Sequence, residues 1–157
     1  MICDLLPGQG VHTLQFGDVA STAREVFGAA IERTHLDSFS LEFEHQGLTL
    51  FFSDPDKLSR VFADGSSDSV RLFGIPISQF FTDYPGLSDL SAWASSHGYE
   101  PQAPEYALGV YDLRIPALHL SFVIGEDGYT GVDLTPGTQQ VGAGQPEKRC
   151  ESIDCSD

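Results

Sequence analysis

The sequence predicts an α+β fold in which two tandem helix-plus-antiparallel-sheet repeats form one compact unit, followed by a mobile C-terminal tail. The main observation is that a helical segment followed by three strand-like segments occurs twice in the same order. The chain has 157 residues, 41% of them hydrophobic and 11 of them Phe, which is enough apolar material for a core. After Leu134 the composition turns to Gly, Gln and Thr. The predicted divisions are a first repeat at 1–69, a second at 70–134 and a flexible tail at 135–157.

The first repeat opens with a predicted short strand over 11–16, in which residues alternate in polarity. Asp18 is predicted to cap a helix that starts at Val19, because an aspartate carboxylate can accept a free N–H of the first turn. The helix is expected to stop at Gly28, although residues 29–33 could extend it.

Three strands are predicted after this helix, over 38–45, 48–52 and 58–63. The first alternates, so that Phe39, Leu41 and Phe43 point to one face and Ser40, Glu42 and Glu44 to the other. The second is almost continuously apolar, which is typical of a central strand. The acidic pair Glu42 and Glu44 is therefore expected to face solvent.

The second repeat has the same order of elements. An extended segment over 70–77 precedes a helix over 87–97, in which Trp93 lies on the apolar face and Gly98 follows as the C′ residue. Three strands are predicted over 106–113, 118–124 and 129–134. The two repeats are expected to correspond at 10–16 with 74–80, at the helices ending at Gly28 and Gly98, and at 48–52 with 118–122.

Charge in this chain is one-sided, with 23 acidic residues against 8 Lys and Arg and a formal net charge of -15. Phosphate must be met by Lys and Arg, so nucleic acid and anionic membrane surfaces are not expected as partners. A basic protein partner would be attracted. A solvated acidic surface without any partner is the alternative explanation of this charge.

No cleaved signal peptide is expected, because residues 1–7 have neither a basic region nor a sustained apolar run, and no apolar run of the sequence approaches the length needed to span a bilayer. The three cysteines, Cys3, Cys150 and Cys155, are odd in number and lie near the termini, which does not indicate a disulfide framework. A cytoplasmic location is therefore expected. No catalytic motif is present, and none of the five histidines has a second His or a Cys at ligand spacing. The sequence thus predicts no enzyme activity, no metal and no cofactor.

The candidate partner-binding residues are acidic side chains of one strand and two turns, together with two tyrosines expected to be exposed. The turn acids lack the further oxygen ligands of a calcium loop and are read as turn-forming residues that could also dock Lys and Arg. Tyrosine is a common interface anchor. The set is Glu42, Glu44, Asp54, Asp56, Tyr99, Tyr111, Glu126 and Asp127.

Three short motifs occur in the first 28 residues, Leu6-Pro7-Gly8-Gln9-Gly10-Val11, Leu14-Gln15-Phe16-Gly17 and Glu25-Val26-Phe27-Gly28. Together they resemble the start of bacterial immunity-type proteins, which are encoded beside secreted antibacterial toxins. The tandem helix-plus-sheet order is also similar to the β-lactamase inhibitory protein and to BamE-type lipoproteins, although Cys3 lacks the signal that a lipidation cysteine needs. The resemblance implies neutralisation of a cognate toxin by binding and assigns no inhibitory residue.

Two other functions stay open at the level of the sequence. One is a small-molecule-binding or enzymatic domain with a cleft between the two repeats, in which His45 or His119 would work beside a carboxylate. The other is a structural or assembly module that associates with itself. The preferred hypothesis is an immunity protein that binds a basic toxin through an acidic surface.

Overall fold

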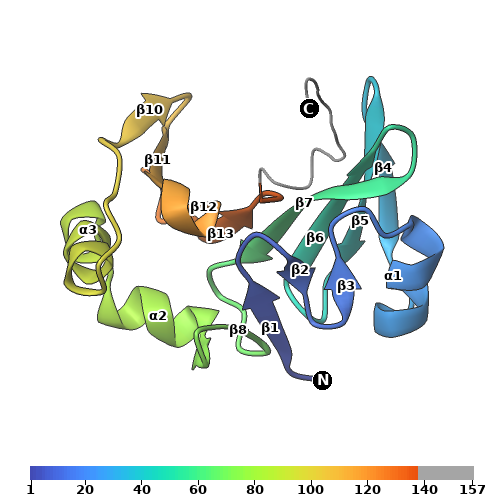
Figure 1. Cartoon of the computed structure of the whole chain (residues 1–157), viewed down its shortest axis with the longest axis horizontal. Coiled ribbons are helices and arrows are strands. Elements are labelled where there is room, and N and C mark those ends of the chain that lie inside the picture. The colour runs from blue at the N-terminus through green and yellow to red at the C-terminus, as the bar shows by residue number, and fades with distance from the viewer. Residues whose placement is uncertain (138–157) are drawn as a thin grey trace, which may run out of the picture.

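The computed structural model describes residues 1–137 and has the predicted α+β architecture, with two helix-plus-antiparallel-sheet repeats in tandem (Figure 1). The elements of the first repeat are β1 (Cys3–Leu6), β2 (Gly10–Val11), β3 (Leu14–Gln15), α1 (Ala20–Phe27), β4 (Ile31–Thr34), β5 (Ser38–Phe43), β6 (Leu48–Ser53) and β7 (Lys57–Asp64). Those of the second are β8 (Val70–Leu72), β9 (Ile75–Pro76), α2 (Ile77–Asp83), α3 (Leu87–Ser96), β10 (Glu105–Ala107), β11 (Val110–Ile115), the 3-10 helix η1 (Pro116–Leu118), β12 (Leu120–Gly125) and β13 (Thr130–Leu134).

The eight-stranded sheet consists of two antiparallel meanders joined edge to edge. Its order is β10-β11-β12-β13-β7-β6-β5-β4, so the last strands of the two repeats, β7 and β13, pair antiparallel at its centre. The shorter sheet has the order β3-β2-β1-β8-β9, in which β1 and β8 pair in parallel. Both sheets therefore contain strands of both repeats.

The two meanders repeat in register. Ser38 pairs with Ser53 in the first and Val110 with Gly125 in the second, so equivalent residues of β5 and β11, and of β6 and β12, lie 72 positions apart (110 against 38, 125 against 53). The equivalence predicted for 48–52 with 118–122 is thus wrong by two residues. The reason is local: residues 116–118 form η1, and His119 adopts a left-handed conformation before β12 begins.

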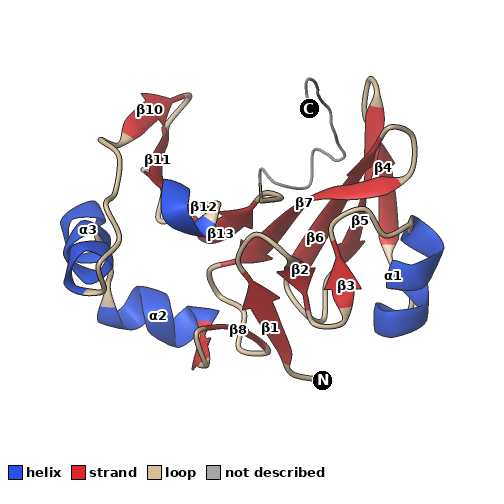
Figure 2. Cartoon of the chain, viewed as in Figure 1, coloured by secondary structure: helices blue, strands red, loops and turns tan. Residues whose placement is uncertain are grey.

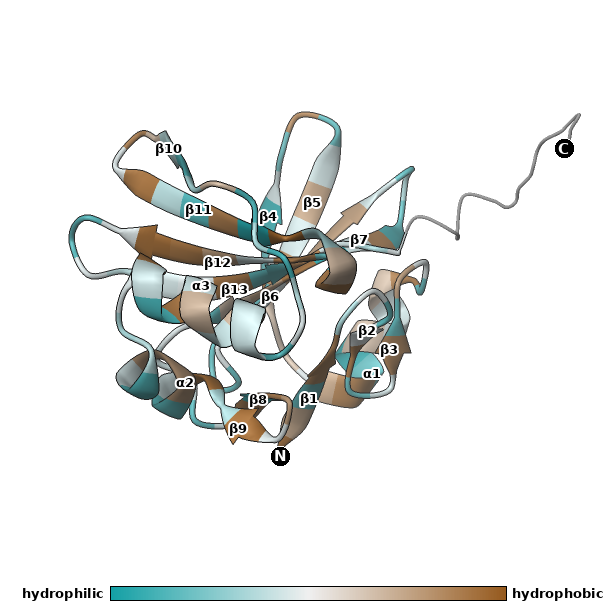
Figure 3. Ribbon diagram, turned by 60° about the vertical axis from the view of Figure 1, so that its left-hand side comes forward, coloured by the Kyte–Doolittle hydropathy of each residue, from teal (hydrophilic) through white to brown (hydrophobic). Residues whose placement is uncertain are grey.

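All three α-helices and the shorter sheet lie on one face of the large sheet (Figure 3). Helix α1 packs at one end, α2 and α3 at the other, and the shorter sheet lies between them (Figure 2). Successive side chains of a strand point to opposite faces, so alternate residues of the large sheet point toward the helices and contribute to the core. They include Leu41, Phe43, Leu50, Phe52, Val61, Leu113, Phe122 and Val132.

Two local predictions in the first repeat are wrong and one is confirmed. The predicted strand 11–16 is interrupted by a turn between β2 and β3, in which His12 has a positive φ. The helix stops at Gly28 as predicted; residues 31–34 form the edge strand β4, so the alternative of a helical extension over 29–33 is wrong. Asp18 does not cap the helix: its carboxylate accepts the backbone N–H of Gln15, and the N–H of Ala20 instead donates to Asp56.

The helix predicted over 87–97 is confirmed as α3, and Trp93 is buried at 5% exposure. Thr135 and Gly137 donate backbone hydrogen bonds to His119 and Gly8, so the first residues of the predicted tail are held against the fold. The rest of that tail, with Cys150 and Cys155, lies outside the described residues. In the part that is described, no helix has the length and apolar character needed to cross a membrane.

Candidate functional site

The face of the large sheet that points away from the helices, called here the open face, has no second layer on it within residues 1–137. One row of directly paired residues crosses it from β5 to β11. The row is Glu42, Thr49, Phe62, Asp133, Ser121 and Arg114. At the middle of the row, Phe62 of β7 pairs with Asp133 of β13. These two residues occupy equivalent positions in the two repeats.

A hollow of about 290 Å³, called here the first-repeat hollow, opens on this face at the ends of β5 and β7 and the start of β6. Three carboxylates line it, from Glu42 at the end of β5, Glu44 in the following turn and Asp64 at the end of β7. No Lys or Arg lines it among the described residues. The antiparallel register brings the acids together, because the ends of β5 and β7 both lie beside the start of β6.

Two aromatic rings also line this hollow. Phe62 and Tyr129 are stacked with centroids 5.9 Å apart and planes 16° from parallel. The Phe62 ring passes over Gly131, where a β-carbon would lie 2.2 Å from its Cζ atom, so a larger residue at this point of β13 would force the ring to move. Burial raises the pKa of the Tyr129 phenol, and the negative charge of Asp64 raises it further.

Two of the three carboxylates have contacts with nearby residues, and a further carboxylate lies beside the hollow. Glu42 is paired with Arg33 of β4 at 3.3 Å, an exposed contact of small energetic value. Asp64 accepts hydrogen bonds from the backbone N–H and hydroxyl of Ser66, which orders the turn after β7. A neighbouring depression shares Glu44 and Asp64 and adds Asp68. Within residues 1–137 no three His, Cys, Asp or Glu side chains are placed to hold a metal ion.

The structure brings together some of the residues predicted from the sequence and separates others. Glu42 and Glu44 share the first-repeat hollow. Glu126 and Asp127 lie in the turn between β12 and β13, at the same end of the sheet, and Asp127 accepts the N–H of Tyr129. Asp54 and Asp56 lie at the opposite end of the sheet, in the turn between β6 and β7. Asp56 is engaged in capping α1.

The two predicted tyrosine anchors are only half-exposed. Tyr99 packs against the core beside Trp93, at 6.4 Å between ring centroids. Tyr111 pairs with Tyr106 at 4.7 Å, near the β10 edge of the sheet. A hydrogen bond to Glu126 raises the pKa of the Tyr106 phenol. Tyr129, which was not selected from the sequence, is the tyrosine that lines the first-repeat hollow.

A second hollow of about 430 Å³, the second-repeat hollow, lies where the internal symmetry places the equivalent of the first. None of its lining residues belongs to the first repeat, since all lie in the second repeat except Thr135, which directly follows β13, so it is not a cleft between the repeats. Its polar side chains include acidic, basic and neutral groups. They are Gln102, Asp112, Arg114, His119, Ser121, Asp133 and Thr135.

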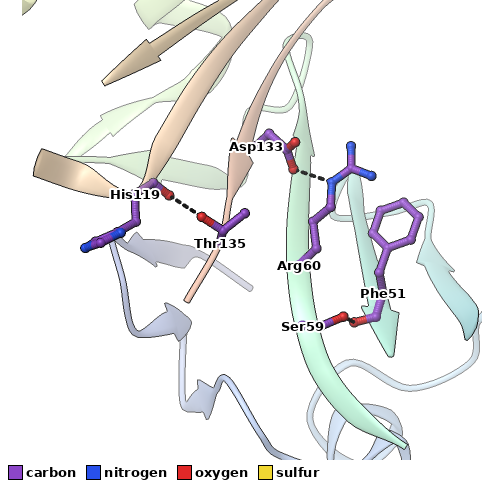
Figure 4. Close-up of polar contacts among 6 residues, drawn as sticks. All are labelled: Phe51, Ser59, Arg60, His119, Asp133 and Thr135. Atoms are coloured by element: carbon purple, nitrogen blue, oxygen red, sulfur yellow. Dashed lines mark hydrogen bonds and ion pairs between the residues drawn. The ribbon is translucent and has the colours of Figure 1, made fainter. Parts of the chain in front are cut away.

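Asp133 is the best-anchored of these side chains. Its carboxylate accepts a hydrogen bond from Nε of Arg60 at 2.7 Å, and the same guanidinium lies 4.5 Å from the centroid of the Phe51 ring (Figure 4). Only 19% of the Asp133 side chain is exposed. Burial raises the pKa of this carboxyl; Arg60 acts in the opposite direction, and the charge of Asp112 raises it again.

Asp112 presents an unusual feature of the second-repeat hollow. Its Oδ1 atom is buried and has no hydrogen-bond partner within residues 1–137. An unsatisfied buried acceptor costs about 1–3 kcal/mol. Its neighbours across the strands are Glu105 and Val123, and neither can donate a side-chain hydrogen bond when Glu105 is ionised.

The sequence analysis missed Phe62, Asp64, Asp112, Asp133 and Tyr129. Period-two alternation within 57–64 already places Phe62 and Asp64 on one face. That this face is also the face of Glu42 follows only from the pairing of β5, β6 and β7. The chain matches no protein-family model, no curated protein and no solved structure.

Proposed function

We propose that the chain is a binding protein of the immunity type, which captures and neutralises a basic antibacterial toxin on the open face of its large sheet. The observation that carries the proposal is the first-repeat hollow. Three carboxylates surround it, two stacked rings form part of its wall, and no cation among the described residues lines it.

A Lys or Arg side chain of the partner suits this hollow in two respects. The carboxylates of Glu44 and Asp64 can accept its N–H donors as charge-assisted hydrogen bonds, which are stronger than neutral ones. The faces of Phe62 and Tyr129 can contact its aliphatic part or its charge. Aromatic residues at the centre of an acidic rim are typical of interface anchors.

The net charge of -15 adds a long-range contribution. It speeds the diffusional encounter with a basic partner, and salt weakens this effect because the field is screened beyond about 8–10 Å at ordinary ionic strength. Association is therefore expected to slow with salt more strongly than dissociation accelerates. The chain needs no catalytic group for this function, because occlusion of the partner's own site is sufficient for inhibition.

The test compares two double variants with the same change in charge. E42K/E44K reverses two carboxylates of the first-repeat hollow. E25K/E100K reverses two exposed glutamates outside both hollows, one on α1 and one after α3. Each tagged protein is used to retain partners from a lysate of the source organism at low and moderate salt, followed by mass spectrometry and by binding kinetics with the retained protein.

We expect one basic protein to be retained by the wild type and by E25K/E100K, with affinity for E42K/E44K lower by roughly 10-fold or more. The retained protein should arrest bacterial growth when expressed alone and lose this effect when the wild-type chain is co-expressed. Equal affinity of the two double variants would contradict the assignment of the surface. A retained protein without toxicity, or one whose toxicity the chain leaves unchanged, would contradict the immunity function.

A further inference from the structure

We propose that the tip of the β10–β11 hairpin, with Leu108 at its end, docks into an apolar pocket of a basic protein partner. The hairpin forms one outer edge of the large sheet (Figure 1). This surface is separate from both hollows, because Leu108 lines neither of them and the nearby Tyr111 shares the helix-covered face with Leu113. The inference therefore goes beyond the proposed function and does not require that the partner is a toxin.

The backbone conformation of Leu108 is unfavourable for a leucine. Leu108 and Gly109 have positive φ values of 53° and 82°, as in the type I′ turn of a two-residue hairpin loop. Asn, Asp or Gly is preferred at the first of these positions, because a leucine β-carbon is crowded in the left-handed region. Phe73 also has a positive φ, but its ring contacts Trp93 at 5.8 Å between centroids. Leu108 is 101% exposed, so the fold within residues 1–137 gives it no such contact.

The first repeat shows that exposure alone does not set Leu108 apart. Leu36 lies at the equivalent place of the β4–β5 hairpin, 72 positions earlier (108 against 36), and is 102% exposed. Its φ is not positive, and its hairpin carries both Arg33 and Asp37. A single exposed leucine of this kind is common on protein surfaces. Leu108 differs because exposure is combined with a costly backbone conformation, which points to a use outside the fold.

The neighbours of Leu108 are aromatic and acidic side chains held in place by hydrogen bonds. Tyr106 and Tyr111 pair across the hairpin with ring centroids 4.7 Å apart, and Tyr106 is 52% exposed. The carboxylate of Glu126 accepts a hydrogen bond from the Tyr106 phenol, and its backbone N–H donates to the carbonyl of Gly109 at 2.9 Å. These contacts join the hairpin to the β12–β13 turn. The tip is thus ordered before a partner arrives, which lowers the entropic cost of binding.

The chemistry of the partner follows from these side chains. A leucine beside two tyrosines fits an apolar pocket, and tyrosine is a common anchor of protein interfaces. Glu105, Glu126 and Asp127 are exposed around the tip, whereas residues 100–113 and 120–137 contain no Lys or Arg. The rim of the pocket is therefore expected to be basic. A second copy of the chain would bring like charges together, and the net charge of -15 opposes an anionic lipid surface.

The first test measures the cost of Leu108 without any partner. Leu108→Asn introduces a residue that a type I′ turn prefers, and Leu36→Asn makes the same change in the equivalent hairpin as the control. We expect L108N to lower the equilibrium constant of unfolding by about 5-fold in urea titrations followed by circular dichroism, and L36N to leave it within about 2-fold. An L108N protein no more stable than the wild type would show that the fold itself favours this leucine, and would overturn the proposal.

The second test identifies what covers the tip. Photoreactive benzoylphenylalanine replaces Leu108 in the tagged full chain, or Leu36 as the control, and each protein is irradiated in a lysate of the source organism. Mass spectrometry should locate adducts of one basic protein at position 108 only, on an apolar surface flanked by Lys or Arg. The purified partner should bind L108N about 10-fold or more weakly than the wild type, because a pocket loses its leucine, and should bind L36N as tightly as the wild type.

The proposal is overturned by absence of an adduct at position 108, by equal adducts at both positions, or by adducts only with lipid or with a second copy of the chain. Equal affinity of L108N and the wild type would also overturn it. The E42K/E44K protein separates this inference from the proposed function. A toxin that depends on Glu42 and Glu44 but not on Leu108 contradicts the hairpin site alone. A harmless basic protein that depends on Leu108 supports the hairpin site and contradicts only the immunity function.

Discussion

The two hollows of the open face occupy equivalent places in the two repeats but have different chemistry. The register equates Glu42 with Arg114, because these residues pair with Thr49 and Ser121. It equates Phe62 with Asp133 in the same way. The first hollow therefore has an acidic rim with an aromatic wall, whereas the second has both charges and, among the described residues that line it, no Phe, Tyr or Trp. The backbone supplies the hollow in each repeat, and the side chains decide what it can bind.

The covered face differs between the repeats too. In the first repeat a single helix packs through Phe27 on Phe43, at 5.2 Å between centroids. In the second repeat, Phe80 and Trp93 from α2 and α3 close on Phe122 at 5.5 and 5.9 Å. The aromatic cluster of the second repeat thus joins two helices to one strand, whereas the first repeat has separate aromatic pairs, Phe27 with Phe43 and Phe39 with Phe52.

The largest expected effect follows from this difference in packing. Phe122 is equivalent to Leu50, and both are fully buried. We expect Phe122→Ala to lower the free energy of unfolding by about 4 kcal/mol and Leu50→Ala by about 3 kcal/mol. Urea unfolding followed by circular dichroism measures both, with Val123→Ala on the open face as the control. A larger loss for Leu50→Ala would show that the first repeat dominates the core.

A smaller effect on stability is expected at the N-termini of α1 and α3, which are capped in different ways. The N–H of Ala20 in α1 donates to Asp56, 36 positions along the chain, whereas Asp89 of α3 accepts the N–H of Gly86 locally. We expect Asp56→Ala and Asp89→Ala each to cost about 1 kcal/mol of stability. Only Asp56→Ala should also speed hydrogen exchange in the turn between β6 and β7, because that cap joins two distant segments. Unchanged exchange in that turn would contradict the long-range role of Asp56.

The smallest effect concerns the position at which one repeat has Phe62 and the other Asp133. Burial raises the folded pKa of Asp133, so the native state holds this proton more tightly than the unfolded chain. Its contribution to stability is present below the ordinary pKa of about 3.9 and is lost as pH rises through the folded pKa. The stability of the wild type relative to Asp133→Asn should therefore fall across that window.

Urea unfolding of both proteins over a series of pH values measures this difference. Ser121→Ala is the matched control, since it removes a polar neighbour of Asp133 without removing a titrating group. The control should keep the pH dependence of the wild type. A wild-type stability that rises relative to Asp133→Asn over the same window would show that Arg60 outweighs burial.

The parts of the fold that were predicted correctly have strong local signals. Alternation over 38–45 predicted β5 and the outward direction of Glu42, although the strand ends at Phe43 and Glu44 lies in the turn that follows. Helical spacing with Gly98 predicted α3 and the burial of Trp93. The strand β4 was missed because its four residues are all exposed and carry no apolar periodicity. Its strand character comes from hydrogen bonding to β5 rather than from burial.

By itself, the sequence determined the α+β class, the tandem order of helix and strands, the acidic charge and the outward direction of Glu42. These properties follow from composition and from periods of two or 3.6 residues, which act within one element. Only the tertiary structure decided that Asp64 and Tyr129 join Glu42 around one hollow, that Asp56 caps α1, and that Asp112 and Asp133 share another hollow. Those juxtapositions depend on strand order and register, which are set by packing between segments far apart in the chain.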